Sequence, residues 1–225
     1  MKILDKKNKI YLLDEDNFDF PTLDMMKDDL VAVGGDFHPQ RLLNAYENGI
    51  FPWYIDEYNY IHWFSPQKRM VLKPEDFKVS KSLKKSILNK GFKIKSNGNF
   101  EEVIKSCANI KRKHEDSTWI SDEFIEAYTN LHHLDIAFSI ECYLNEELVG
   151  GLYGLLIGDI FCGESMFAKV TDASKVAFYH LCQQAKQNGI KLIDCQVYNE
   201  HLASLGASEI SRNEYFQLLK ENFDS

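Results

Sequence analysis

The chain has 225 residues, of which 44% are hydrophobic and 27% charged, a balance typical of a soluble globular protein. No apolar run approaches the roughly 18 residues that a membrane span requires, and the lysine-rich segment Met1–Tyr11 lacks an apolar signal core. The five cysteines are widely spread without a CxxC pair, which argues against a disulfide framework and a zinc site. We therefore expect no membrane partner, no metal, and a cytoplasmic location.

The charge is unevenly placed along the chain. The net charge of −8 taken alone argues against a polyanionic partner. Between Lys68 and Lys95, however, ten basic residues, Arg69 among them, are opposed only by Glu75 and Asp76. A concentrated basic segment can bind a phosphate backbone, because the local potential steers association. The alternative, a lysine-rich face that only contacts solvent, remains open at this point.

The first part of the chain is rich in aromatic, proline and turn residues. Pro39 and Gly49 bracket a predicted helix, since proline favours the first helical position and glycine the position past the end. The segments Phe51–Tyr54 and Ile61–Pro66 are typical of short strands or loops. We expect residues 1–71 to form a small N-terminal domain.

The next segments alternate between helical and extended patterns. Ser82–Lys90 is predicted to be a helix ended by Gly91, and a short strand begins at Phe92. Two further helices are predicted from their caps. Asn99 with Glu102 would form a capping pair for the first, and Ser121 would cap the second.

A meander of three strands follows. The predicted strands are Ile136–Leu144, Leu148–Ile157 and Ile160–Phe167, joined by tight turns at Asn145-Glu146 and Gly158-Asp159. Asp172 opens a long helix that ends at Gly189, a buried strand covers Lys191–Tyr198, and Ser211 with Glu214 forms a capping box for a closing helix. This order predicts an α/β (α+β) fold in which residues 72–225 form an acetyltransferase-like (GNAT-like) mixed-sheet domain.

The most informative polar residues lie on the last predicted strand. Because alternate residues of a strand share a face, Asp194 and Gln196 should project together from an otherwise apolar segment. Such a pair is costly to bury unless both groups are hydrogen-bonded. The pair is either structural or a relay, in which Asp194 holds the Gln196 amide so that its carbonyl oxygen accepts a proton from an amine.

A second polar residue lies in the segment Phe161–Phe167. By alternation, Cys162, Glu164 and Met166 should share one face. A carboxylate between aromatic residues suits the capture of a cationic group beside an apolar pocket, although an edge-strand Glu that reaches water is the alternative. Neither Cys162 nor Cys195 has a neighbouring His, so we interpret both as small core residues.

The sequence gives no sign of a coenzyme. It lacks the Arg-x-x-Gly-x-Gly/Ala loop with which acetyltransferases bind the pyrophosphate of coenzyme A, and the histidines show no metal-ligand spacing. We therefore expect no cofactor. Among the tryptophans, Trp53 in the Pro52–Tyr54 segment is the best candidate to stack on a base.

Several segments together resemble the leucyl/phenylalanyl-tRNA–protein transferase family. They occur in the family's order and span residues from about 20 to about 215. The matching segments are Leu30–Asp36, Tyr46–Tyr54, Trp63–Pro66, Thr118–Ile120, Leu148–Gly154, Cys162–Phe167, Asp172–Lys175, Leu192–Gln196 and His201–Gly206.

The resemblance implies an enzyme that uses aminoacyl-tRNA in place of a coenzyme. Members of the family transfer Leu or Phe, and less readily Met, to proteins that begin with Arg or Lys, which marks those proteins for degradation. It further implies that Asp194 and Gln196 are the catalytic pair and that Glu164 lines the site for charged substrate groups.

The resemblance also implies the binding residues. Trp53 and Trp119 would hold the terminal adenosine, and Phe161, Met166 and Ile193 would form the apolar pocket for the Leu or Phe side chain. Lys81, Lys84 and Lys85 would bind tRNA. They replace a commonly arginine-rich stretch, so bidentate phosphate contacts are lost.

Two other functions are compatible with parts of the sequence. A coenzyme A-dependent N-acetyltransferase would share the fold but lacks its pyrophosphate loop. A non-catalytic tRNA-binding module would account for the basic segment but leaves Asp194, Gln196 and Glu164 unexplained.

Overall fold

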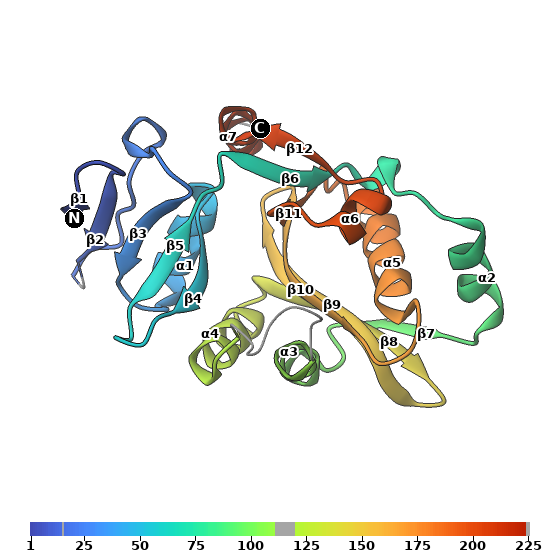
Figure 1. Ribbon diagram of the computed structural model, residues 1–225. Coiled ribbons are helices and arrows are strands. Elements are labelled where there is room, and N and C mark those ends of the chain that lie inside the picture. The colour runs from blue at the N-terminus through green and yellow to red at the C-terminus, as the bar shows by residue number, and fades with distance from the viewer. Residues whose placement is uncertain (15, 111–119, 224–225) are drawn as a thin grey trace.

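The computed structural model describes residues 1–14, 16–110 and 120–223, and its strands form two sheets (Figure 1). The first sheet has five strands in the order β1-β2-β3-β5-β4. Their bounds are Lys2–Asp5 (β1), Ile10–Leu13 (β2), Leu30–Gly34 (β3), Phe51–Ile55 (β4) and Ile61–Phe64 (β5). The helix α1 (Pro39–Glu47) lies between β3 and β4, so the helix and both strands predicted for this part are confirmed.

The second sheet has seven strands in the order β12-β6-β11-β10-β9-β8-β7. Their bounds are Lys68–Leu72 (β6), Lys93–Ser96 (β7), Ala137–Leu144 (β8), Glu147–Ile157 (β9), Ile160–Ala168 (β10), Leu192–Gln196 (β11) and Ser208–Ser211 (β12). Only β10 and β11 pair in parallel, because α5 crosses between them, and the other neighbours are antiparallel. The structure confirms the predicted fold class.

Helices cover both faces of the second sheet (Figure 1). On one face, α5 (Ala173–Gln187) packs on β8, β9 and β10, and α2 (Lys81–Asn89) packs on α5. On the other face lie α3 (Phe100–Asn109) and α4 (Asp122–His133). The short α6 (Glu200–Ser204) and the closing α7 (Arg212–Phe223) flank β12, while 3-10 turns occupy Leu23–Met25 and Pro74–Asp76. Along the described stretches, none of the helices combines the length and hydropathy that crossing a bilayer requires.

The predicted turns and caps are confirmed with one exception, the cap at Asn99. Asn145 and Glu146 adopt left-handed φ angles of 51° and 65°, as a tight hairpin turn demands. The Ser121 hydroxyl accepts from the Phe124 N–H, and Ser211 and Glu214 bond reciprocally. The Asn99 side chain, in contrast, forms no capping bond; the buried Glu141 carboxylate instead accepts from the backbone N–H of residues 98 and 99.

Asp172 is the N-cap residue of α5, so the predicted start of this helix is confirmed, although the residue is left-handed and its side chain makes no capping bond. Its carboxylate accepts from the Ser86 hydroxyl at 2.7 Å and pairs with Lys175 at 3.3 Å. The residue therefore links α2 to α5. The side chain is used for this tertiary contact, and so it is not available for capping.

The chain passes from one sheet to the other at residues 65–67. β6, which a boundary at residue 71 would divide, belongs wholly to the second sheet. One hydrophobic cluster contains buried residues of both sheets, among them Trp63 and Tyr153. Arg212 of α7 adds polar links, since its guanidinium donates to the carbonyls of Ser65 and Asp28. The division into two domains near residue 71 remains a prediction.

Two glycines face each other across β9 and β10 and differ sharply in the space around them. A Cβ on Gly154 would lie 2.2 Å from the Cys162 carbonyl oxygen and 2.7 Å from the Phe161 ring. A Cβ on Gly163 would meet only the Asp194 carbonyl oxygen, at 3.4 Å, an ordinary contact distance. Gly154 is therefore required for the close approach of the two strands.

We expect Gly154→Ala to lower the free energy of unfolding by about 1–3 kcal/mol or more, because the backbone must shift to relieve the overlap. Gly163→Ala is the matched control and should change it by much less. Urea denaturation of both variants would test this. Equal losses for the two would contradict the packing described here.

Candidate active site

A pocket opens where the two parallel strands separate. β10 and β11 pair from Ile160↔Leu192 to Cys162↔Asp194, and the residues that follow on each strand line a cavity of about 350 Å³. Further lining comes from β4, α5 and α6. The site therefore lies at the carboxyl end of β11 and beside the middle of β10, where the two parallel strands diverge.

Most of the predicted site residues come together in this pocket. Lining it are Trp53, Phe161, Glu164, Met166, Ile193, Asp194 and Gln196. Trp119 lies outside the described residues. The structure therefore brings seven of the predicted site residues together, and their roles remain predictions.

A bulge in β10 places Glu164. The pairing with β9 runs from Gly163↔Gly154 directly to Ser165↔Tyr153, so Glu164 is the additional residue. The bulge reverses the alternation beyond it. Cys162 packs in the cluster on the α3 and α4 side, whereas Met166 packs on the α5 side. The prediction that Cys162, Glu164 and Met166 share one face is therefore wrong.

A second bulge ends β11. Its pairing with β6 runs from Asp194↔Val71 to Gln196↔Met70, so Cys195 is the additional residue, and Gln196 has a left-handed φ of 63°. The strand therefore stops at Gln196, before the predicted end at Tyr198. A non-glycine residue in this conformation is strained and persists only where its surroundings hold it.

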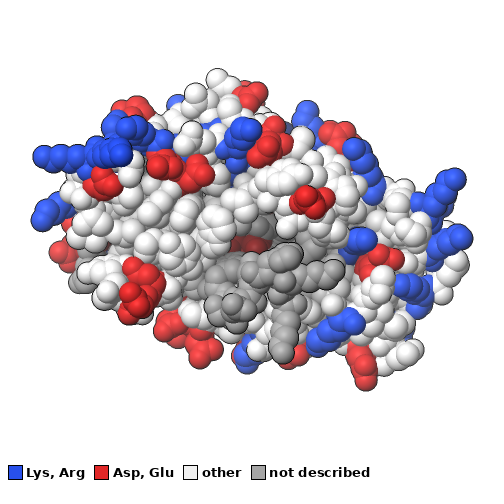
Figure 2. Space-filling view, in the orientation of Figure 1, with Lys and Arg blue, Asp and Glu red and all other residues white. Residues whose placement is uncertain are grey.

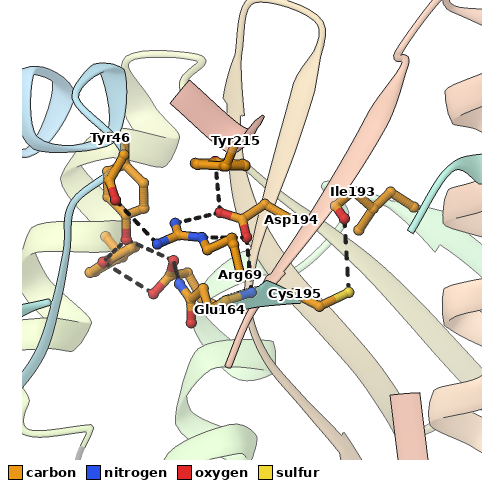
Figure 3. A network of polar contacts seen from close by, with 10 residues as sticks. Tyr46, Arg69, Glu164, Ile193, Asp194, Cys195 and Tyr215 are labelled. Carbon is orange, nitrogen blue, oxygen red and sulfur yellow. Dashed lines mark hydrogen bonds and ion pairs between the residues drawn. The ribbon is translucent and has the colours of Figure 1, made fainter. Parts of the chain in front are cut away.

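The Asp194 carboxylate is completely buried and fully hydrogen-bonded (Figure 3). Its Oδ1 accepts from Arg69 Nε at 2.8 Å and from the backbone N–H of Gln196 at 2.9 Å. Its Oδ2 accepts from Arg69 Nη2 at 2.6 Å and from the Tyr215 hydroxyl at 2.9 Å. The predicted contact between Asp194 and the Gln196 side-chain amide is therefore wrong, because the carboxylate binds the backbone of Gln196 instead.

The Gln196 amide binds Glu164. Nε2 donates to Glu164 Oε1 at 2.8 Å, and Oε1 of Gln196 accepts no hydrogen bond from a described residue. Tyr46 donates to the same carboxylate at 2.7 Å and Tyr128 at 3.2 Å. Burial raises the pKa of Glu164 to about 7, although the two tyrosine hydroxyls act in the opposite direction.

The sequence analysis did not identify four members of this network. It gave no polar role to Tyr46, Tyr128 or Tyr215, and it counted Arg69 only in the basic segment, yet Arg69 is buried. Burial by itself lowers the pKa of Arg69, but the Asp194 carboxylate, together with Tyr215 and Cys162, raises it overall. A tyrosine on a buried stripe needs a partner for its hydroxyl, and this was the available signal.

The predicted tRNA-binding lysines lie apart from the pocket. Lys81, Lys84 and Lys85 are exposed on α2, where basic side chains gather at the right-hand edge of Figure 2. None of the three forms an ion pair with a described residue. Other members of the basic segment are partly neutralised, since Lys93 pairs with Glu146.

The pocket combines an apolar wall with a carboxylate and an amide of fixed orientation. The amide oxygen can accept a proton-bearing group, and the carboxylate can attract a cation. Within the described part of the chain, no group of three or more His, Cys, Asp or Glu comes together in a way that would hold a metal ion. The arrangement suits the alignment of two substrates beside an apolar side chain.

Comparisons with known proteins agree on one family. Residues 71–220 match the sequence model of the leucyl/phenylalanyl-tRNA protein transferase family, and residues 35–67 match that of its N-terminal domain. The leucyl/phenylalanyl-tRNA–protein transferase of Flavobacterium johnsoniae is 49% identical over 211 residues, covering 94% of this chain and 99% of that protein. The enzyme of the same name from Sulfurimonas denitrificans is 51% identical over 196 residues, covering 87% and 85%.

Solved structures are similar in fold. The crystal structure of FemX aligns with a TM-score of 0.50 at 12% identity, over 87% of this chain and 75% of that one. A GCN5-related N-acetyltransferase from Kribbella flavida aligns with a TM-score of 0.41 at 11% identity, over 81% and 65%.

The buried carboxyl group predicts how stability depends on pH. Folding raises the pKa of Glu164 from 4.5 to about 7. Its contribution to the free energy of unfolding is therefore complete below pH 4.5 and is lost as the pH rises through 7. Over this range we expect the free energy of unfolding to fall by about 3 kcal/mol more for wild type than for Glu164→Gln. Chemical denaturation between pH 4 and 8 would measure it, with the exposed Glu147→Gln as control. Parallel curves for wild type and Glu164→Gln would contradict the assignment.

Proposed function

Because the chain belongs to the leucyl/phenylalanyl-tRNA–protein transferase family, we propose that it transfers Leu, Phe or Met from aminoacyl-tRNA to proteins that begin with Arg or Lys. The chain is a transferase that moves an aminoacyl group from tRNA to a protein. The observation that carries the finer proposal is the joining of an apolar wall and the Glu164–Gln196 pair in one pocket.

The reaction requires alignment more than strong base catalysis. The amino group of the acceptor attacks the ester carbonyl carbon of aminoacyl-tRNA, so a peptide bond forms and the bond to the terminal ribose oxygen breaks. The amine gives up a proton, and the ribose oxygen leaves with one. Aminolysis of an activated ester is favourable, so positioning supplies most of the acceleration. Gln196 Oε1 would accept the hydrogen bond of the attacking amine.

The apolar wall would select the donor amino acid. Phe161 and Ile193 are almost completely buried, and Met166 is half-buried. A pocket of this kind separates Leu, Phe and Met from smaller side chains by only about 1–3 kcal/mol per methylene, so we expect imperfect selection. Trp53, with Trp119, would hold the terminal adenosine.

The buried carboxylate would select the acceptor. Glu164 is the acidic group of the pocket that retains access to a cationic substrate, since all acceptor positions of Asp194 are occupied. An acceptor whose first residue is Arg or Lys carries such a charge. We further propose that the transfer marks acceptors for degradation in the cytoplasm.

Purified protein incubated with radiolabelled leucyl-tRNA should label peptides that begin with Arg or Lys and leave peptides beginning with Asp or Ala unlabelled. Gln196→Ala should slow the transfer by about 100-fold, because the attacking amine loses its acceptor. Filter binding of the same tRNA should be unchanged for this variant.

Three outcomes would overturn parts of the proposal. Label on the Asp peptide would retain the chemistry and remove the acceptor preference. Binding of tRNA without any labelled peptide would indicate a binding module. Acetyl transfer from coenzyme A would indicate an acetyltransferase.

Replacing Lys81, Lys84 and Lys85 together by Gln should weaken tRNA binding and make it less salt-dependent. Each lost phosphate contact lowers the slope of log K against log salt by about 0.7–0.9, so the expected decrease is about 2–3. The control replaces Lys2, Lys6 and Lys7, which are exposed near β1, and makes the same change of charge. Equal effects of both triple variants would mean that α2 has no special part in binding.

A further inference from the structure

Arg69 has the most enclosed guanidinium of the site region. Its side chain is 2% exposed and lies between two aromatic rings, 4.7 Å from the Phe51 centroid and 4.5 Å from the Tyr215 centroid. Nε and Nη2 donate to the Asp194 carboxylate, and Nη1 donates to the Gly49 carbonyl oxygen at 3.1 Å. Two aromatic rings and three hydrogen-bonding nitrogens therefore hold the guanidinium, whose bonds to Asp194 are drawn in Figure 3.

These contacts join parts of the pocket that are distant in sequence. Arg69 belongs to β6, Asp194 to β11 and Tyr215 to α7. Gly49 lies in the turn that leads into β4, and the β4 residues Phe51, Pro52 and Trp53 line the pocket. One side chain thus connects the catalytic strand to the wall that carries Trp53.

The same contacts determine what Asp194 can do. Four donors occupy its two oxygens, so no acceptor position is open toward a substrate. Asp194 is linked to Gln196 by one hydrogen bond, in which its Oδ1 accepts from the Gln196 backbone N–H. Gln196 is the residue with the left-handed φ. Asp194 therefore holds the backbone from which the Gln196 side chain projects.

We propose that Arg69 is a positioning residue of the transfer reaction, acting through Asp194 on Gln196 and through Gly49 on the β4 wall. This inference rests on the function proposed above. The Arg69 guanidinium would keep a fixed distance between Gln196 Oε1, which would accept from the attacking amine, and the β4 wall with Trp53, which would hold the adenosine. Alignment of amine and ester depends on that separation.

The alternative is that Arg69 is only a buried ion pair that stabilises the fold. Loss of one partner from such a pair is destabilising whatever its part in catalysis. The two possibilities differ in the activity of those variant molecules that remain folded. A structural role predicts unchanged turnover per folded molecule, whereas a positioning role predicts reduced turnover with nearly unchanged substrate binding.

The test compares Arg69→Lys with Arg212→Lys. Lysine keeps the charge but offers a single point of donation in place of the planar fork. Arg212 is also buried and also donates to backbone carbonyls, but its hydrogen bonds go to Pro66, Asp28 and Ser65 and not to Asp194. Transfer from leucyl-tRNA to an Arg-initiated peptide is measured well below the unfolding temperature and divided by the folded fraction from circular dichroism.

For Arg69→Lys we expect kcat to fall by about 10–100-fold, with KM for both substrates within about threefold of wild type. For Arg212→Lys we expect a lower unfolding temperature with kcat within about twofold of wild type. Equal kcat values for the two variants would overturn the inference. Wild type that fails to transfer would instead overturn the proposed function.

Tyr215→Phe covers the case in which Arg69→Lys does not fold. It removes one donor to Asp194 and keeps the ring that stacks on Arg69. We expect a several-fold decrease in kcat with KM unchanged. The inference would be overturned if Arg69→Lys cannot fold while Tyr215→Phe folds and keeps the wild-type kcat. Arg69 would then contribute to stability alone.

Discussion

Two carboxylates buried on neighbouring strands impose the constraint on which the rest of this structure depends. Asp194 is 0% exposed and Glu164 is 8% exposed. A buried charge without partners is too costly to persist, so each oxygen must be supplied with donors. Arg69 and Tyr215 supply Asp194, and Tyr46 and Tyr128 supply Glu164. Their positions fix where β6, α7, α1 and α4 can lie.

The same demand explains why the site belongs to neither sheet alone. Tyr46 comes from α1, which packs on α4 and β9 although it lies between two strands of the first sheet. The Gly49 carbonyl that binds Arg69 follows directly after that helix. The polar network and the apolar cluster around Trp63 therefore both connect the two sheets. The arrangement of the pocket and the cohesion of the two sheets therefore depend on the same contacts.

Local patterns in the sequence were sufficient for the longer helices and the central strands, but β1, β2, β3, β6, β12 and α6 were not predicted. Strand periodicity and the turn at Asn145-Glu146 identify β8, β9 and β10, and the resemblance of short segments led to the residues that line the pocket. The two bulges could not be predicted, because Glu164 and Cys195 are additional residues only relative to partner strands. The burial of Arg69 was hidden for the same reason: its partner Asp194 is 125 residues away in sequence. A basic residue beside Lys68 gives no local sign that its neighbour across the sheet is a carboxylate.

The long separation between Arg69, Asp194 and Tyr215 also has a consequence for synthesis. As the polypeptide leaves the ribosome, the β6 arginine emerges well before its carboxylate partner, and the hydroxyl on α7 emerges after both. The Asp194 carboxylate therefore has its full set of donors only once residue 215 has cleared the exit tunnel. Contacts so distant in sequence form late, since loop closure precedes them. The polar network around Asp194 is therefore completed only after every strand of the second sheet has been synthesised.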